Sequence, residues 1–262
     1  MQNKKLSKES IVKYVLLGSI ALLAIVLCII FRDKLSHSFY TNFIAKKRWK
    51  NITEGLKNTF IITGAAFVIG IIMGLLTCLV LGLRSNNTLV LIVKQIFKAY
   101  VSIFRGTPMM VQLLIMYFII FAAWHFTGAA LLIAVIAFGL NSGAYISEIL
   151  RGGIGSVPIG QMEAGRSLGL SYSKTMTKVV FPQAIKNSLP SLGNEFITLF
   201  KETSIAGYVS VLDLTLAFKK ITGNTYDFMF VYLVMGLVYF GFVMIFTYLF
   251  RLIEWGLNKN AR

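Results

Sequence analysis

Long runs without a charged side chain constrain this 262-residue chain more than any other feature. A helix of about 20 apolar residues is long enough to cross the hydrocarbon layer of a membrane. Three uncharged runs have about this length, and a fourth is long enough for two crossings: 14–31, 58–83, 228–250 and 106–147. Residues 124–128 can form the turn inside the fourth run. The pattern predicts an all-α polytopic membrane protein.

A sixth crossing is predicted at 189–212, where Glu195, Lys201 and Glu202 interrupt the apolar pattern. The run at 14–31 follows four lysines, as in a signal peptide, but no small-x-small cleavage site follows it, so we expect an uncleaved span. We therefore divide the chain into 1–56, an N-terminal span with an amphipathic surface segment, and 57–262, a membrane domain. The total is about six transmembrane helices.

The formal charge of +16 has two explanations. Nucleic-acid binding is one, but no motif for it is present. Basic loops that face the cytoplasm are the other, and we favour this explanation. Lys and Arg number 16 on the predicted side of segment 160–183 and 9 on the other side, with Lys201 in the membrane. This segment is therefore predicted to be cytoplasmic. The basic segment 32–57 falls on the opposite side, where its aromatic residues would let it lie flat on the lipid surface.

Segment 160–183 is polar, although it lies between apolar runs. Ser156 can cap a helix with Pro158 in its first turn. Gly169 can end that helix in the left-handed conformation, and Ser171 can cap a second helix. The prediction is a rigid pair of short helices near 158–170 and beyond. An ordinary loop between spans is the alternative.

Several short motifs occur in order over roughly 58–254. They are Arg105-Gly106-Thr107-Pro108, Leu140-Asn141-Ser142-Gly143-Ala144-Tyr145, Glu163-Ala164-Gly165 followed by Gly169, Pro182-Gln183-Ala184, and Lys201-Glu202-Thr203-Ser204. Together they resemble the membrane permease subunits of bacterial ABC importers, in particular the polar amino acid permeases with their cytoplasmic "EAA" loop. Gly165 departs from the pattern, since alanine is usual there, and we expect it to loosen the helix.

The resemblance implies a non-catalytic subunit of an ATP-driven amino acid importer in the bacterial cytoplasmic membrane. It implies a five-helix permease core, here with one extra N-terminal span, and a helix that couples to a separate ATPase. The coupling residues would be Glu163, Ala164, Gly165, Arg166 and Gly169. Glu163 near the helix start would suit the helix dipole, and Arg166 can pair with the partner.

The same resemblance implies the other components of the transporter. These are ATPase subunits, a second permease subunit (identical or related), an extracytoplasmic substrate-binding protein, an amino acid substrate and membrane lipid, without nucleic acid. The chain has no GxxxxGK[ST] loop, so ATP and Mg would be bound by the partner, and we expect this chain to bind no cofactor or metal.

Polar residues inside the apolar segments are candidates for the translocation path, because such residues generally face a cavity or a partner. The candidates are Asn141, Ser142, Tyr145, Glu148, Lys201, Thr203 and Ser204. The first three fall one turn apart and can share a helix face, although a buried hydrogen-bonded helix contact is equally consistent. Glu148 can line the path or pair with Arg151 or Arg105.

Residues 201–204 interrupt their span and predict a broken helix beside the cavity. A local Lys201–Glu202 pair that merely holds the bend is the alternative. Segment 105–108 is interpreted as a structural bend. Three rival functions remain: a secondary transporter or channel, a membrane enzyme, and a non-transporting sensor. The first lacks a recognisable filter or inverted halves, and the second lacks clustered histidines or a nucleophile set.

Overall fold

The computed structural model describes residues 18–19, 32–83, 85–124 and 126–259, and every regular element in these ranges is helical. The predicted span at 14–31 lies outside the described residues, except for Gly18 and Ser19. The long helices are α3 (Trp49–Gly82), α4 (Thr88–Gly106), α6 (Ala129–Gly155), α9 (Phe181–Glu202) and α11 (Phe228–Lys259). The shorter ones are α2 (Arg32–Phe39), α5 (Met109–Ile115), α7 (Ile159–Ser167), α8 (Tyr172–Thr175) and α10 (Leu214–Thr225).

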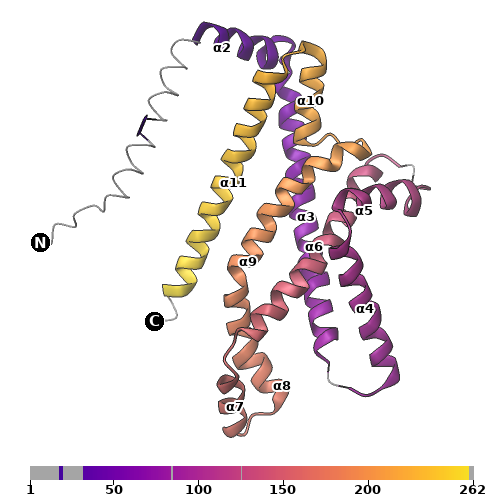
Figure 1. Ribbon diagram of the computed structural model, residues 1–262, viewed down its shortest axis with the longest axis vertical. Helices are drawn as coiled ribbons and strands as arrows, with labels where there is room; N and C mark the ends of the chain where they lie inside the picture. The colour runs from indigo at the N-terminus through magenta and orange to yellow at the C-terminus, as the bar shows by residue number, and fades with distance from the viewer. Residues whose placement is uncertain (1–17, 20–31, 84, 125, 260–262) are drawn as a thin grey trace, which may run out of the picture.

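Five further helical segments, of π or 3-10 type, join or extend these helices. They are η1 (Tyr40–Ile44), η2 (Ala45–Lys47), η3 (Met116–Ile120), η4 (Met176–Val180) and η5 (Thr203–Val209). The five long helices run lengthwise through the molecule, as Figure 1 shows. The all-α class is therefore confirmed.

In the described ranges, three helices are long and apolar enough to cross a membrane: Trp49–Gly82, Ala129–Gly155 and Phe228–Leu257. A fourth crossing is added if Thr88–Gly106 and Met109–Ile120, which are bent by 113° relative to each other, count as one. α9 runs lengthwise beside them (Figure 1). The chain is thus a multi-pass membrane protein.

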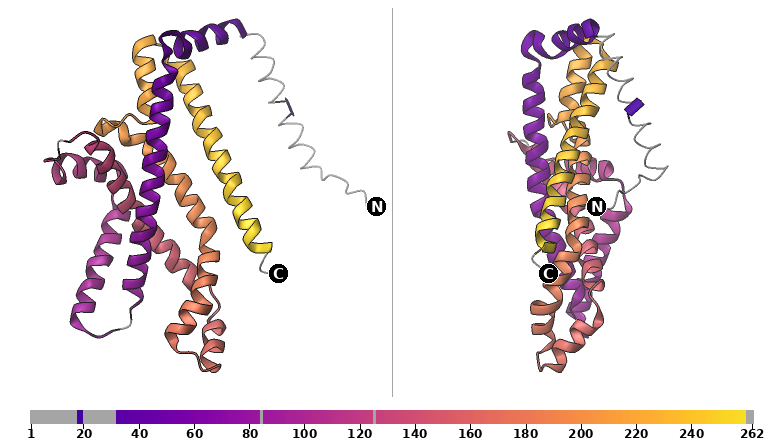
Figure 2. Two further views of the ribbon diagram at one scale, coloured as in Figure 1. Left: turned by 180° about the vertical axis from the view of Figure 1, so that it is seen from behind. Right: turned by 90° about the vertical axis from the view of Figure 1, so that its left-hand side faces the viewer.

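The first half of segment 106–147 differs from the expectation of two complete crossings. The chain breaks at Thr107 and Pro108, and the preceding residues form α4, which runs beside the part of α3 nearer the α7 end (Figures 1 and 2). The charge count had assigned Lys94 and Lys98 to a cytoplasmic loop, but both lie within α4. Arg105 lies at the far end of that helix. An amphipathic helix that carries lysines is not found by a search for uncharged runs, which explains the error.

The core is centred on the contact between α3 and α6, the most extensive helix pair in the described chain. Small residues allow the close approach. A Cβ atom on Gly74 would lie 2.5 Å from Cγ2 of Ile146, and one on Gly70 would lie 3.0 Å from Oγ of Ser142. The Gly70–Gly74 pair therefore packs within the chain, as small residues do at membrane helix interfaces.

The two ends of the bundle carry different elements. α7 and α8 lie at one end, while α10 and α2 lie at the other (Figure 1). α2 runs across the bundle end, at a steep angle to α3 and α11 (Figure 2). Asn42 attaches this region by donating from Nδ2 to Oδ2 of Asp227 over 2.8 Å. Segment 32–57 thus begins at the end opposite α7, where the predicted order of spans places it, although its basic charge runs against the charge count.

Candidate functional site

The helix pair predicted within 158–183 is present, with a small shift in its start. α7 begins at Ile159 after Pro158, whereas Ser156 ends α6 and donates its hydroxyl to the carbonyl of Gly153. The prediction that Ser156 caps α7 is therefore wrong. Gly169 has a φ of 81° and ends the helix as expected, with the N–H of Leu170 donating to the carbonyl of Gly165.

The second helix begins as predicted. The Ser171 hydroxyl accepts a hydrogen bond from the N–H of Lys174 at 3.3 Å and so caps α8. The expectation for Glu163 is wrong, because the first turn of α7 contains no acidic residue and Glu163 lies in the second turn. Its interaction with the helix dipole is correspondingly weak, since that effect is confined to the terminal turn.

Gly165 is the buried residue of α7, and it packs directly against α8. A Cβ atom at this position would lie 2.4 Å from Cγ2 of Thr175, which is itself fully buried. The Thr175 hydroxyl donates to the carbonyl of Ser171 over 3.1 Å. The expectation that Gly165 loosens the helix is therefore wrong. The glycine instead permits α7 and α8 to pack closely.

The helix pair is also attached to the two long helices that flank it. Asn187 of α9 donates to the hydroxyl of Ser156 at the end of α6, over 2.9 Å. Gln183 donates to Oε1 of Gln161 on α7 over 3.3 Å. One turn further along, the Ser188 hydroxyl would collide with any Cβ on Gly153, so α6 and α9 cross in close contact. α7 thus contacts α9 directly, and α9 in turn contacts the end of α6.

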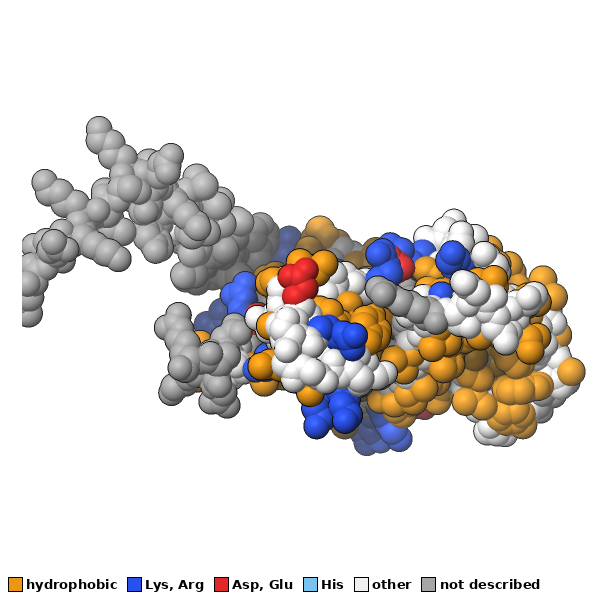
Figure 3. Space-filling view, turned by 90° about the horizontal axis from the view of Figure 1, so that it is seen from below, with side chains coloured by type: hydrophobic (Ala, Val, Ile, Leu, Met, Phe, Trp, Pro, Cys, Tyr) orange, Lys and Arg blue, Asp and Glu red, His pale blue; other side chains and the backbone are white. Residues whose placement is uncertain are grey.

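Most of the predicted coupling residues lie on the surface of this end. Glu163, Ala164, Arg166 and Gly169 are exposed, whereas Gly165 is buried. Arg166 also donates to the carbonyl of Leu170, so part of its hydrogen-bonding capacity serves the helix end. Figure 3 looks onto this end of the molecule and shows lysine and arginine side chains gathered on it beside hydrophobic ones.

Two apolar side chains on this surface were missed by the sequence analysis. Ile159 is 77% exposed and Leu168 is 82% exposed, one at each end of α7. Both would have been assigned to a core by their type alone. Large exposed apolar side chains on a polar surface are typical of contact sites for another protein.

The candidate path residues do not form one group. Asn141 is buried and donates from Nδ2 to Oε1 of Gln112 (2.9 Å) and to the carbonyl of Phe104 (3.2 Å). Gln112 in turn donates to the carbonyls of Phe104 and Thr107. These carbonyls are left without partners where α4 ends, and the two amide side chains satisfy them. Asn141 thus holds the 113° bend of segment 105–108.

Ser142 faces the opposite way from Asn141. Its hydroxyl is buried between α3 and α9 and donates to Oε1 of Glu195 over 2.8 Å. Glu195 had been noted only as an interruption of an apolar run. Its partner is 53 positions earlier in the chain, so no local pattern could have identified the pair.

Tyr145 and Glu148 lie on an accessible face of α6 with Arg151, and Arg105 of α4 approaches the same face. The Arg105 guanidinium lies 5.4 Å from the Tyr145 ring centroid, and its Nη1 lies 3.5 Å from Glu148 Oε2. Arg151 donates from Nε to Glu148 Oε1 over 3.1 Å. The side chains of Arg105, Glu148 and Arg151 are 42%, 23% and 66% exposed. Glu148 therefore pairs with both arginines that the sequence offered as partners, while still facing open space.

The helix break predicted at 201–204 is present. α9 ends at Glu202 and continues as the 3-10 helix η5. Lys201 and Ser204 line a cavity of about 480 Å³ together with residues of α11, including Tyr239. Thr203 is buried instead and donates to the carbonyl of Phe200 over 2.7 Å. Two of the three predicted residues thus face a cavity.

The family of this chain follows from its sequence. Residues 66–259 match the family described as "Binding-protein-dependent transport system inner membrane component". The chain belongs to this family and is therefore a membrane component of a binding-protein-dependent transport system. Systems of this family operate with an ATPase and a binding protein.

Several similar proteins from bacteria are named for amino acid transport systems. The chain is 38% identical to the L-cystine transport system permease protein TcyB of Bacillus subtilis, over 71% of this chain and 77% of that protein. It is 37% identical to the arginine transport system permease protein ArtQ of the same organism, over 80% and 93%. A crystal structure of an amino acid ABC transporter with histidines matches with a TM-score of 0.72 and 36% identity, over 81% of this chain and 97% of that chain.

Proposed function

We propose that this chain is the translocating subunit of an ATP-driven amino acid importer in the bacterial cytoplasmic membrane. Relatives that are 37% and 38% identical are named for arginine and cystine transport. The chain itself would hydrolyse nothing. ATP and Mg would be bound by a partner ATPase, and an extracytoplasmic binding protein would deliver the amino acid between two permease subunits, identical or related.

The attachment of α7 to the long helices carries the proposal. An exposed helix that only linked two spans would need no fixed contacts with either of them. Here Gly165 packs on α8, one hydrogen bond joins α7 to α9, and another joins α9 to the end of α6. We infer that α7 is the coupling helix, that its exposed face with Ile159 and Leu168 binds the ATPase, and that closure of the ATPase dimer moves α6 and α9.

The exposed charges on α6 support a path along this face. Arg105, Glu148 and Arg151 belong to helices of the membrane domain, yet their side chains are accessible. Charged side chains that faced the hydrocarbon layer would be costly, so an aqueous path or a second subunit is the expected environment. Lys201 and Ser204 line a second part of this path in the proposal, beside the break in α9.

Transport by the reconstituted complex tests the proposal. The full chain, with the ATPase and binding protein encoded beside it, would be placed in vesicles and supplied with labelled arginine, glutamine or cystine. We expect uptake of at least one of them that requires both ATP and the ATPase. Uptake that persists without the ATPase would favour a secondary carrier instead. A folded complex that hydrolyses ATP and imports none of them would point to another substrate class or to a regulatory subunit.

A matched pair of variants tests the docking surface separately. Leu168→Ala and Ile159→Ala remove exposed side chains, so the fold should lose less than about 0.5 kcal/mol. Leu89→Ala is the control, because Leu89 is 72% exposed but lies at the start of α4. We expect the α7 variants, and Glu163→Ala, to weaken assembly with the ATPase and coupled uptake. If the α7 variants and the Leu89 control assembled with the ATPase and supported uptake equally well, the docking assignment would be refuted.

A further inference from the structure

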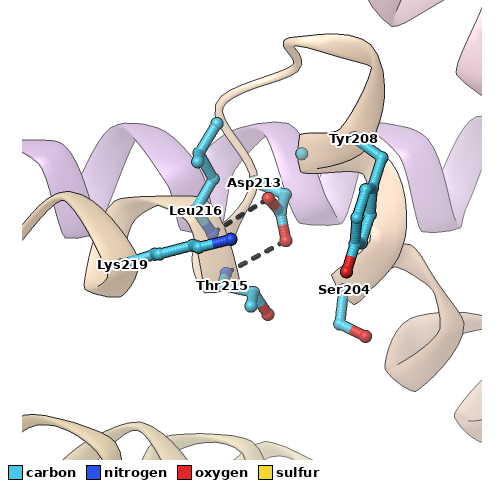
Figure 4. A pocket seen from close by; sticks show the side chains of 7 residues that line it. Ser204, Tyr208, Asp213, Thr215, Leu216 and Lys219 are labelled. Atoms are coloured by element: carbon cyan, nitrogen blue, oxygen red, sulfur yellow. Dashed lines mark hydrogen bonds between the residues drawn. The ribbon is translucent and has the colours of Figure 1, made fainter. Parts of the chain in front are cut away.

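A small cavity with several polar side chains in its walls lies toward the end of the bundle opposite α7. It has a volume of about 110 Å³ and lies between η5 and the start of α10. Figure 4 shows its walls: Tyr208 and Ser204 on one side, and Asp213, Thr215 and Lys219 on the other. The candidate path residues of the sequence analysis include only Ser204 among these.

Groups of opposite character converge on this cavity. Lys219 is exposed, and its Nζ lies 6.0 Å from the centroid of the Tyr208 ring. Asp213 is buried, and its two oxygens accept hydrogen bonds from the N–H groups of Thr215 and Leu216, each over 3.0 Å. Lys219 forms no ion pair with Asp213 in the described part of the chain. The ammonium group therefore points into the cavity while Asp213 serves the helix end.

This cavity adjoins the one lined by Lys201. Ser204 and Thr215 belong to the walls of both, and Thr215 also shares a hydrogen bond of 2.9 Å with the hydroxyl of Tyr239. The two cavities therefore meet at Ser204 and Thr215. Each cavity presents one ammonium group and at least one hydroxyl-bearing side chain.

We propose that the cavity formed by Lys219, Tyr208, Asp213, Ser204 and Thr215 is an entry site for the zwitterionic end of an amino acid, ahead of the cavity at Lys201. The α-carboxylate would accept hydrogen bonds from Lys219 and Ser204. The α-ammonium group, one carbon away, would lie against the Tyr208 ring and the Asp213 carboxylate. The inference rests on the proposed function and adds the location and chemistry of one site.

Such a site would recognise what all amino acids share. The cavity is too small to hold a long side chain as well, so the side chain would point out of it. Selection among amino acids would then be made elsewhere, and this site would keep the released substrate from returning to the outside. Loss of the site should therefore lower the number of amino acids imported per ATP hydrolysed more than it lowers the rate of ATP hydrolysis.

The ratio of amino acids imported to ATP hydrolysed tests the inference. Lys219→Met would be compared with Lys219→Arg, which keeps the charge, and with Lys220→Met. Lys220 is the adjacent exposed lysine and does not line the cavity, so it controls for net charge. The complex in vesicles would receive saturating binding protein and labelled arginine, glutamine or cystine, whichever the unmodified complex imports.

We expect Lys219→Met to lower the transport ratio by about ten- to a hundredfold, the value of a lost charge-assisted hydrogen bond. ATP hydrolysis stimulated by the binding protein should persist, and Lys219→Arg should recover most of the ratio. An unchanged ratio in Lys219→Met, or an equal loss in Lys220→Met, would overturn the entry site but leave the importer intact. If the unmodified complex imports none of the three amino acids, the proposed function itself fails, and the entry site with it.

Discussion

Substitution of Gly165 by alanine tests how α7 is held. The new Cβ would lie 2.4 Å from Cγ2 of Thr175, and overpacking of this kind costs about 1–3 kcal/mol. Alanine also favours a helix over glycine by about 1 kcal/mol. The net expectation is a loss of stability of about 0–2 kcal/mol, concentrated in the α7–α8 pair. Hydrogen exchange of the amides in 159–175 would measure it, because exchange reports local stability.

The double variant makes the prediction specific. Thr175→Ser removes Cγ2 but keeps the hydroxyl that donates to Ser171. The remaining contacts of a Cβ atom added to Gly165, 3.1 Å to Oγ1 and 3.3 Å to Cβ of residue 175, need only shifts of a few tenths of an ångström. Gly165→Ala combined with Thr175→Ser should therefore be at least as protected as the unmodified chain, with a coupling energy of about 1–2 kcal/mol. Independent, additive effects of the two substitutions would refute the close-packing account.

Three further predictions concern buried or paired polar groups. Burial raises the pKa of Asp213 from 3.8 to about 6, so the folded state binds a proton there more tightly than the unfolded state does. Stability relative to Asp213→Asn, which keeps a capping side chain, should fall by up to about 3 kcal/mol as pH rises from about 4 to 6; a pH-independent difference in thermal unfolding would contradict this. Asn141→Leu should lower the free energy of unfolding by about 1–3 kcal/mol, because Oε1 of Gln112 loses its donor. Tyr145→Leu should lower it less, and equal losses would argue against a role of Asn141 in holding the bend of segment 105–108. Glu148→Gln should reduce uptake of arginine more than uptake of glutamine, because a carboxylate that faces the path attracts a cationic substrate. Equal effects on both would indicate that Glu148 only pairs with Arg105 and Arg151.

Much of the fold could be predicted because its signals are local. The uncharged runs located α3, α6 and α11, and single residues located the turn of the α7–α8 pair, since Gly169 adopts φ > 0 and Ser171 caps α8. α4 was missed because its lysines interrupt the apolar pattern. A helix with one charged and one apolar face looks like a loop when only charge is counted.

The site could be predicted less well, because it depends on contacts between distant residues. Asn141 bonds to Gln112 and Phe104, which are 29 and 37 positions away, so its role in the bend is not visible in its own motif. The reason for glycine at 165 is the Thr175 methyl group, which belongs to another helix. Exposure of Leu168 is likewise a property of the fold and not of the residue type.

Photo-crosslinking at Leu168 tests the central claim most directly. A benzophenone side chain would be placed at this position, and at Leu89 as the control, in the complete complex in vesicles. The account predicts an adduct between residue 168 and the ATPase subunit, with none from residue 89. A complex that imports amino acids with ATP but forms no adduct from residue 168 would contradict the assignment of α7 as the coupling helix.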